Sequence, residues 1–111
     1  MPAIDYRAAR SQLRLAEVLH LLGFAPRWRR GDQVRGACLL HRARTLRSRS
    51  FAAHLGRDLW YCFVCRTGGN DLDLWVAATH QELHAAVIDL CARLSRDVPW
   101  LMPKGGRMPV P

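Results

Sequence analysis

Four residues with metal-binding side chains fall into two close pairs near the middle of the sequence. The segment CLLH at residues 38–41 is followed, after 20 intervening residues, by CFVC at residues 62–65. Two ligands separated by two residues can point at one ion from a single turn, and two such turns supply the tetrahedral coordination that zinc prefers. The spacing predicts one Zn²⁺ ion with the ligands Cys38, His41, Cys62 and Cys65. Four protein ligands leave no position for water, so we expect a structural site and no catalytic residues.

Other kinds of chemistry fit these and neighbouring residues less well. A redox dithiol normally begins a helix, whereas Cys62 ends a predicted strand. Asp71 and Asp73 could suggest a carboxylate pair for a catalytic metal, but residues two apart on a helix diverge, and acids in a first turn are explained by capping and the helix dipole. Cys91 lies in an apolar stripe and is predicted to be buried. His54 is predicted to be a surface side chain, with a reserve metal ligand as the alternative.

The charge of the chain is concentrated in one segment. The formal net charge is +8, and the segment from Arg27 to Arg57 holds nine arginines and one acid, Asp32, while the rest of the chain is neutral. The planar arginine fork matches phosphate oxygens, so the natural partner is a polyanion, above all nucleic acid. A solvated arginine-rich loop is the alternative.

Aromatic residues accompany this basic segment. Unpaired bases stack on exposed aromatic rings while arginines neutralise the phosphates, which is how single strands are usually held. The aromatic candidates are Trp28, Phe51, Trp60, Tyr61 and Phe63. Strand alternation places Trp60 and Tyr61 on opposite faces. The predicted nucleic-acid contacts are Arg44, Arg47, Arg49, Arg57, Arg66 and Trp60.

The patterns around these residues predict an α+β fold, a small antiparallel zinc ribbon with one helix before it and two after it. Apolar spacing indicates a helix over residues 15–22 that ends at Gly23. Residues 27–36 are expected to form a loop leading into a short strand at 33–37. A hairpin is predicted from residues 51–55 and 59–63. Asn70 is predicted to cap a helix that runs to about Ala78, and Thr79 with Glu82 has the spacing of a capping box for the last helix.

The same patterns suggest how the chain is organised. An N-terminal arm and helix (1–26), the basic ribbon (27–70) and a helical pair (71–96) are expected to form one domain over residues 14–96. A disordered tail rich in proline and glycine would follow at 97–111. The first residues lack the apolar core of a secretion signal, and no run is long enough to span a bilayer. We therefore expect a soluble, cytoplasmic protein, in which cysteines serve as ligands more readily than as disulfides.

Taken together, these motifs resemble the Cys-His-Cys-Cys zinc ribbon at the N-terminus of bacterial and phage DNA primases. The similar segments are CLLH at 38–41, SFAA at 50–53, YCFVC at 61–65, GGN at 68–70 and AAV at 85–87, so the resemblance covers roughly residues 14–95. The chain departs from the family at Leu39, where proline is usual, and at Ala43, where an acid is usual. It looks like a divergent short member of the kind found as a stand-alone chain.

The resemblance implies a function in DNA replication. It implies binding of a single-stranded DNA template for primer synthesis, with a primase catalytic subunit, a helicase or a mobile-element protein as a further partner. In full-length primases a separate TOPRIM-type domain joins nucleotides, so primer synthesis by this chain alone is not expected. Two alternatives stay open: a protein adaptor docking on a replication or mobile-element partner, and a zinc-ribbon transcriptional regulator that reads duplex DNA.

Overall fold

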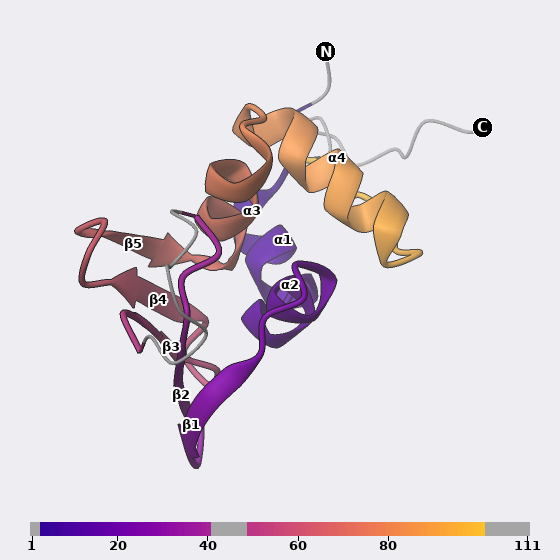
Figure 1. The fold of residues 1–111 in the computed structure, drawn as a ribbon. Coiled ribbons are helices and arrows are strands. Elements are labelled where there is room, and N and C mark those ends of the chain that lie inside the picture. Colours follow the sequence, from indigo (N-terminus) through magenta and orange to yellow (C-terminus); the bar gives the residue numbers. More distant parts are fainter. Residues whose placement is uncertain (1–2, 41–48, 102–111) are drawn as a thin grey trace.

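The computed structural model describes residues 3–40 and 49–101, and these form four helices and one five-stranded antiparallel sheet (Figure 1). The predicted α+β class is confirmed. The helices are α1 (Tyr6–Gln12), α2 (Leu15–Leu21), α3 (Asp71–Thr79) and α4 (Leu83–Arg93). The strands are β1 (Pro26–Arg30), β2 (Gln33–Gly36), β3 (Phe51–His54), β4 (Leu59–Cys62) and β5 (Thr67–Asn70). Within the described ranges, the helices are too short or too polar to cross a membrane.

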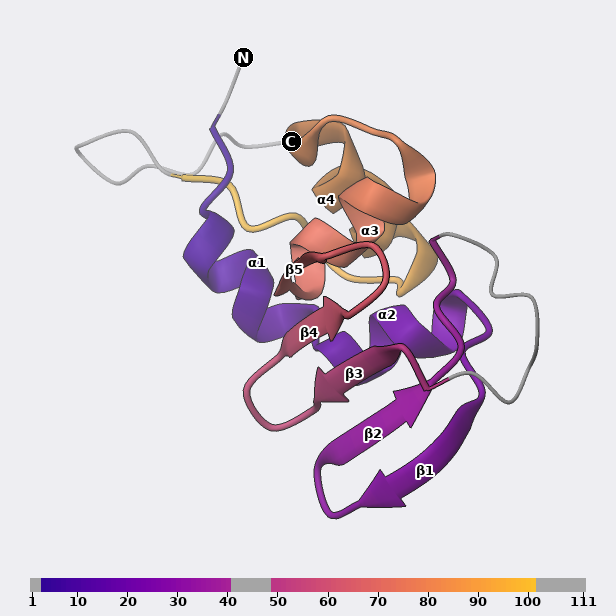
Figure 2. The same cartoon turned by 60° about the vertical axis from the view of Figure 1, so that its left-hand side comes forward.

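The sheet is a meander in which each strand pairs with the next one along the chain, in the order β1-β2-β3-β4-β5. Figures 1 and 2 show the helices gathered on one side of it. Since paired residues share a face, the row of Val34, Ala53 and Trp60 points to the helices and is buried. The adjacent row of Arg35, Ala52 and Tyr61 points to the opposite, outer face.

Aromatic packing joins the sheet to the segment after α2. The Phe24 and Phe51 rings lie 5.2 Å apart between centroids, and Phe51 stacks on Trp60 at 5.6 Å. The Trp60 indole N–H donates to the carbonyl of Asn70 over 2.8 Å, so its polar atom is satisfied inside the core. This packing fixes which face of β4 is available to solvent.

Helix termini follow the predictions in part. Gly23 has a φ of +74° just after α2, as expected of a glycine that ends a helix. Asn70 caps α3, with reciprocal 2.9 Å hydrogen bonds between its backbone and side chain and those of Asp73. The capping box predicted from Thr79 and Glu82 is wrong. Thr79 is the last residue of α3, and its hydroxyl donates to the Trp75 carbonyl over 2.6 Å instead of capping α4.

Three elements were not predicted. Residues 26–30 form β1, because the turn at Gly31, with φ +58°, folds them back onto β2. Residues 67–70 form β5 on the free edge of β4, where a Cβ atom at Gly68 would lie 2.5 Å from the Trp60 carbonyl oxygen. Helix α1 is capped by Asp5, whose carboxylate accepts from the N–H of Ala8 over 3.1 Å.

The two ends of the described chain pair with each other. Ile4 forms an antiparallel bridge with Trp100, and the N–H of Asp5 donates to the Pro99 carbonyl over 2.8 Å. The packed structure therefore extends on both sides of residues 14–96, and the first residues of the expected tail are extended.

Candidate metal centre and nucleic-acid interface

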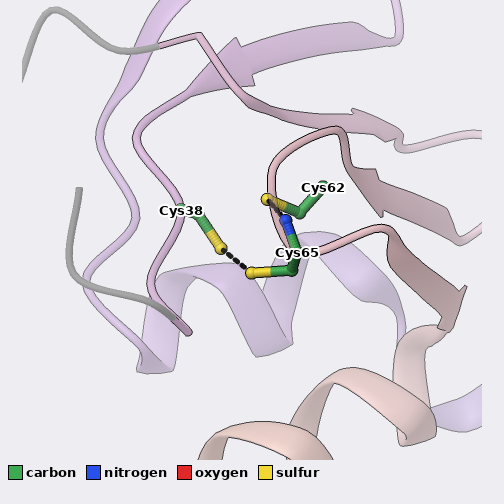
Figure 3. A group of neighbouring side chains, drawn as sticks. All are labelled: Cys38, Cys62 and Cys65. Atoms are coloured by element: carbon green, nitrogen blue, oxygen red, sulfur yellow. Dashed lines mark hydrogen bonds between the residues drawn. The ribbon is translucent and has the colours of Figure 1, made fainter.

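Three of the predicted ligands converge from separate parts of the sheet. Cys38 follows β2, Cys62 ends β4, and Cys65 lies in the turn before β5 (Figure 3). Their Sγ atoms all lie within 4.8 Å of one another, and those of Cys38 and Cys65 are 4.0 Å apart. Zinc–sulfur bonds of about 2.3 Å in a tetrahedron place two sulfur atoms about 3.8 Å apart. The cluster therefore has the dimensions of a zinc site.

The turns that carry the cysteines also point backbone N–H groups at sulfur. The N–H of Cys65 lies 3.4 Å from the Cys62 Sγ, and the N–H of Leu40 lies 3.3 Å from the Cys38 Sγ. Arg66 closes the turn between β4 and β5, with a φ of +54° and a 2.8 Å hydrogen bond from its N–H to the Cys62 carbonyl. Such donors stabilise thiolates, which are the form that binds metal.

The pKa values of two clustered cysteines shift in opposite directions. Burial raises the pKa of Cys62, but hydrogen bonds from the N–H groups of Cys65 and Val64 and from the Cys38 and Cys65 side chains together outweigh it and leave that pKa below its ordinary value. Burial, together with the adjacent Cys62 and Cys38, raises the pKa of Cys65 to about 12. Three thiolates at this spacing repel one another, so a divalent cation is the partner that would let them coexist. The donor set therefore fits zinc.

Several predicted site residues lie outside the described residues. These are His41, the predicted fourth ligand, and Arg44 and Arg47, two predicted nucleic-acid contacts. Their assignment stays a prediction.

The outer face of the sheet carries a hollow of about 570 Å³ near the cysteine cluster. Trp28, Tyr61 and Phe63 contribute aromatic rings to its lining, and the Tyr61 and Phe63 rings meet edge to face at 5.1 Å. The Arg35 guanidinium lies 5.2 Å from the centroid of the Phe63 ring and donates to the Arg49 carbonyl over 2.9 Å. Tyr61 and Phe63 are 41% and 57% exposed, so their rings are accessible to a ligand.

The other predicted nucleic-acid contacts lie at different places in the structure. Arg49 lines the outer-face hollow, Arg57 is exposed on the turn between β3 and β4, and Arg66 is exposed beside the cysteine turn. Trp60 also lines the outer-face hollow, but it is only 5% exposed and packs in the core, so its ring offers little surface for a base to stack on. Arg35 was not singled out from the sequence, although its alternation with Val34 and the pairing of β2 with β3 could have placed it on the outer face.

Asp71 has a different environment from the one that helix capping suggests. Its carboxylate is fully buried, and neither oxygen has a hydrogen-bond partner within the described part of the chain. The Arg10 Nε lies 3.6 Å from one of these oxygens. Burial raises the pKa of Asp71 to about 6, and the charge of Asp58 adds to the increase. The nearby backbone N–H groups of Leu72 and Asp71 and, to a smaller extent, the charge of Arg10 oppose it.

Replacing Asp71 with asparagine is expected to stabilise the protein at neutral pH. Because the folded pKa of about 6 exceeds the ordinary 3.8, wild-type protein loses stability as the pH rises from about 4 to about 6. The Asp71→Asn variant escapes this loss, so its free energy of unfolding should exceed that of wild type by about 1 to 3 kcal/mol above pH 6. Urea unfolding at pH 4 and pH 7.5 measures this. A variant less stable at pH 7.5 would show that the ion pair with Arg10 outweighs burial.

A small antiparallel sheet with clustered cysteines on its turns and helices on one side is the architecture of a zinc ribbon. The model of the CHC2 zinc finger, the zinc ribbon of DnaG, matches residues 6–104 of this sequence. The chain belongs to that family, which confirms the resemblance to primase zinc ribbons. The family and the cysteine cluster together support zinc binding by a primase-related domain.

The fold has a counterpart among solved structures. The structure of the Aquifex aeolicus primase, comprising its zinc-binding and RNA polymerase domains, is similar with a TM-score of 0.67 and 19% sequence identity. The match covers 88% of this chain and 23% of that one. A comparison with curated proteins gave no match.

Proposed function

We propose that this chain is a zinc-stabilised module that binds single-stranded DNA on the outer face of its sheet and serves primer synthesis in DNA replication. The observation that carries the proposal is the exposed pair of rings, Tyr61 and Phe63, beside Arg35 and Arg49 in one hollow. Exposed apolar side chains that adjoin one another mark interaction sites, and arginines next to these two rings suit a polyanion that also presents flat apolar surfaces.

In this proposal one zinc ion holds the platform together. Cys38, Cys62 and Cys65, with His41 as the fourth ligand, would bind it. The ion would tie the end of β2 to the turn between β4 and β5, and thereby fix the position of Phe63 between two of the ligands. The zinc ion would stabilise the fold and take part in no reaction, because four protein ligands leave no coordination position for water or substrate.

The strand would be held by two kinds of contact. Bases stack on Tyr61 and Phe63, and each stacked base typically contributes about 1 to 3 kcal/mol with little dependence on sequence. Phosphates meet the surrounding arginines, for which we propose Arg35, Arg44, Arg47, Arg49, Arg57 and Arg66. Bases in a duplex already stack on one another and do not present their faces, so this surface favours single strands. Nucleotide joining would be the task of a primase catalytic subunit, and a helicase is a further candidate partner.

The test is binding of zinc-loaded protein to a single strand and to a duplex of the same sequence over a range of salt. We expect the single strand to bind more tightly, with an affinity that falls steeply with salt. Neutralising about three to six phosphates with these arginines gives a slope of log K against log salt of roughly −2 to −4 for single strands. Fluorescence anisotropy at several salt concentrations measures both quantities. Preference for the duplex would favour a transcriptional regulator, and zinc loading without binding to either would favour a protein adaptor.

A further inference from the structure

A second hollow, of about 610 Å³, lies on the N-terminal helix and is separate from the outer face of the sheet. Helix α1 and the residues after it line one side with Tyr6, Arg7, Arg10, Ser11 and Arg14. The turn between β3 and β4 lines the other side with Gly56 and Asp58. Three arginines on one surface are notable because they lie outside the central segment that holds the excess charge of the chain.

One of these arginines is held in place by a carboxylate, and another carboxylate lies near a second one. The Arg14 Nε lies 2.8 Å from Asp58 Oδ2, and its Nη2 donates to the Gly56 carbonyl over 3.4 Å. Arg10 faces Asp71, whose side chain is entirely buried, while 45% of the Arg10 side chain stays exposed.

The guanidinium of Arg7 has no ion-pair partner among the described residues and is exposed. The surface therefore combines one fixed guanidinium group, that of Arg14, with the exposed groups of Arg7 and Arg10. Three guanidinium groups face two carboxylates here, which leaves a local excess of one positive charge.

The turn between β3 and β4 connects the two hollows. His54 and Leu59, at the ends of this turn, line the outer-face hollow, whereas Gly56 and Asp58 line the second one. Arg57, between them, is exposed. Figure 2 shows this turn beside α1, at the edge where the sheet meets the helices. A chain of phosphates could therefore pass from one hollow to the other by way of Arg57.

We propose that the second hollow binds phosphate groups of the same nucleic-acid strand, so that the footprint runs from the outer face of the sheet, around the β3–β4 turn, onto α1. This inference rests on the proposed function. Guanidinium forks pair with phosphate oxygens in bidentate geometry, and side chains three residues apart on a helix are about 5 to 6 Å apart at Cβ. Arg7 and Arg10 can thus serve neighbouring phosphates, while Arg14 stays fixed by Asp58 and the Ser11 hydroxyl donates to the Arg7 carbonyl over 3.3 Å.

The experiment compares two lengths of oligothymidylate, one of about four nucleotides that fits the outer-face hollow alone and one of about fifteen that can reach both. The test variant is Arg7→Ala, which removes the guanidinium without an ion-pair partner. The control for the loss of one positive charge is Arg93→Ala in α4, because Arg93 lines neither hollow and pairs with Asp89. We expect Arg7→Ala to weaken binding of the long strand by about tenfold and to make its salt slope shallower by about 0.7. Binding of the short strand should change less than about twofold.

A second variant separates charge from geometry. Arg10→Lys keeps a cation opposite Asp71 but loses the planar fork, so it should also weaken the long strand and spare the short one. Unchanged long-strand affinity in Arg7→Ala, or an equal loss in Arg93→Ala, would overturn the second site. A different result would contradict the proposed function: Tyr61→Leu would bind the short strand as tightly as wild type. A selective loss of long-strand binding in Arg7→Ala would still identify a phosphate site on α1 in that case.

Discussion

Replacing Cys62 with serine is expected to abolish zinc binding and to unfold the protein. Cys62 is completely buried and ends β4, so its loss affects the metal site and the sheet together. A structural zinc ion contributes an apparent binding free energy of about 10 to 16 kcal/mol in zinc-finger peptides, comparable with the whole stability of a small domain, about 5 to 15 kcal/mol. A serine hydroxyl is a poor zinc ligand and leaves two thiolates without their cation. Zinc content by atomic absorption and thermal unfolding by circular dichroism measure the result.

Cys91 provides the matched control for this substitution. It is 1% exposed in α4 and is not among the clustered sulfur atoms, so Cys91→Ala should keep the zinc content of wild type. Loss of one buried sulfur should lower the free energy of unfolding by only about 1 to 2 kcal/mol. Wild-type zinc content and melting in Cys62→Ser would contradict the zinc assignment. Equal loss of zinc in both variants would place the metal elsewhere.

The parts of the site that could be predicted from the sequence are those set by local geometry. Two residues between ligands fix the shape of a turn, so the convergence of Cys62 and Cys65 follows from a few neighbouring residues. Cys38 lies far from this turn in the sequence. Its approach could be predicted only because a tetrahedral zinc ion needs four ligands, and the pair of Cys38 and His41 supplies the two that Cys62 and Cys65 do not. The hairpin of β3 and β4 and the cap at Asn70 are likewise local.

The parts that could not be predicted depend on distant contacts. The sequence TGGN of β5 has no apolar alternation, and it pairs as a strand because β4 offers an edge and Gly68 allows close approach. Alternation places Trp60 and Tyr61 on opposite faces, but only the position of the helices decides which one is buried. Asp71 is drawn into the interior because α3 packs against β4 and β5.

The net charge of the sequence outside the central segment does not reveal the basic surface on α1. Outside the central segment the basic and acidic residues balance, yet Glu17 is paired with Arg96, at the far end of the chain, and does not neutralise Arg7 or Arg10. Net charge over a segment therefore understates a local excess when the acids are used in long-range ion pairs. The spacing of Arg7, Arg10 and Arg14 was a signal that could have been read.

Replacing Tyr61 and Phe63 together with leucine is expected to remove most of the affinity for single-stranded DNA. Leucine keeps an apolar side chain on the outer face but offers no ring, so each substitution should cost about 1 to 3 kcal/mol of stacking, roughly fivefold to a hundredfold in affinity per ring. Phe63→Leu also removes the partner of the Arg35 guanidinium, which lies 5.2 Å from its ring. Anisotropy titrations with oligothymidylate of about four nucleotides isolate this hollow from the one on α1.

Two further comparisons decide whether stacking is the cause. Tyr61→Phe keeps the ring and loses only the hydroxyl, so its affinity should stay within about twofold of wild type. Both rings lie on the outer face of the sheet, with Tyr61 41% and Phe63 57% exposed, so we expect the double leucine variant to bind zinc and unfold like wild type. That result would exclude a folding defect as the reason for lost binding. If the double variant binds as tightly as wild type, the rings are not the platform, and the exposed apolar surface of β4 would then point to a protein partner.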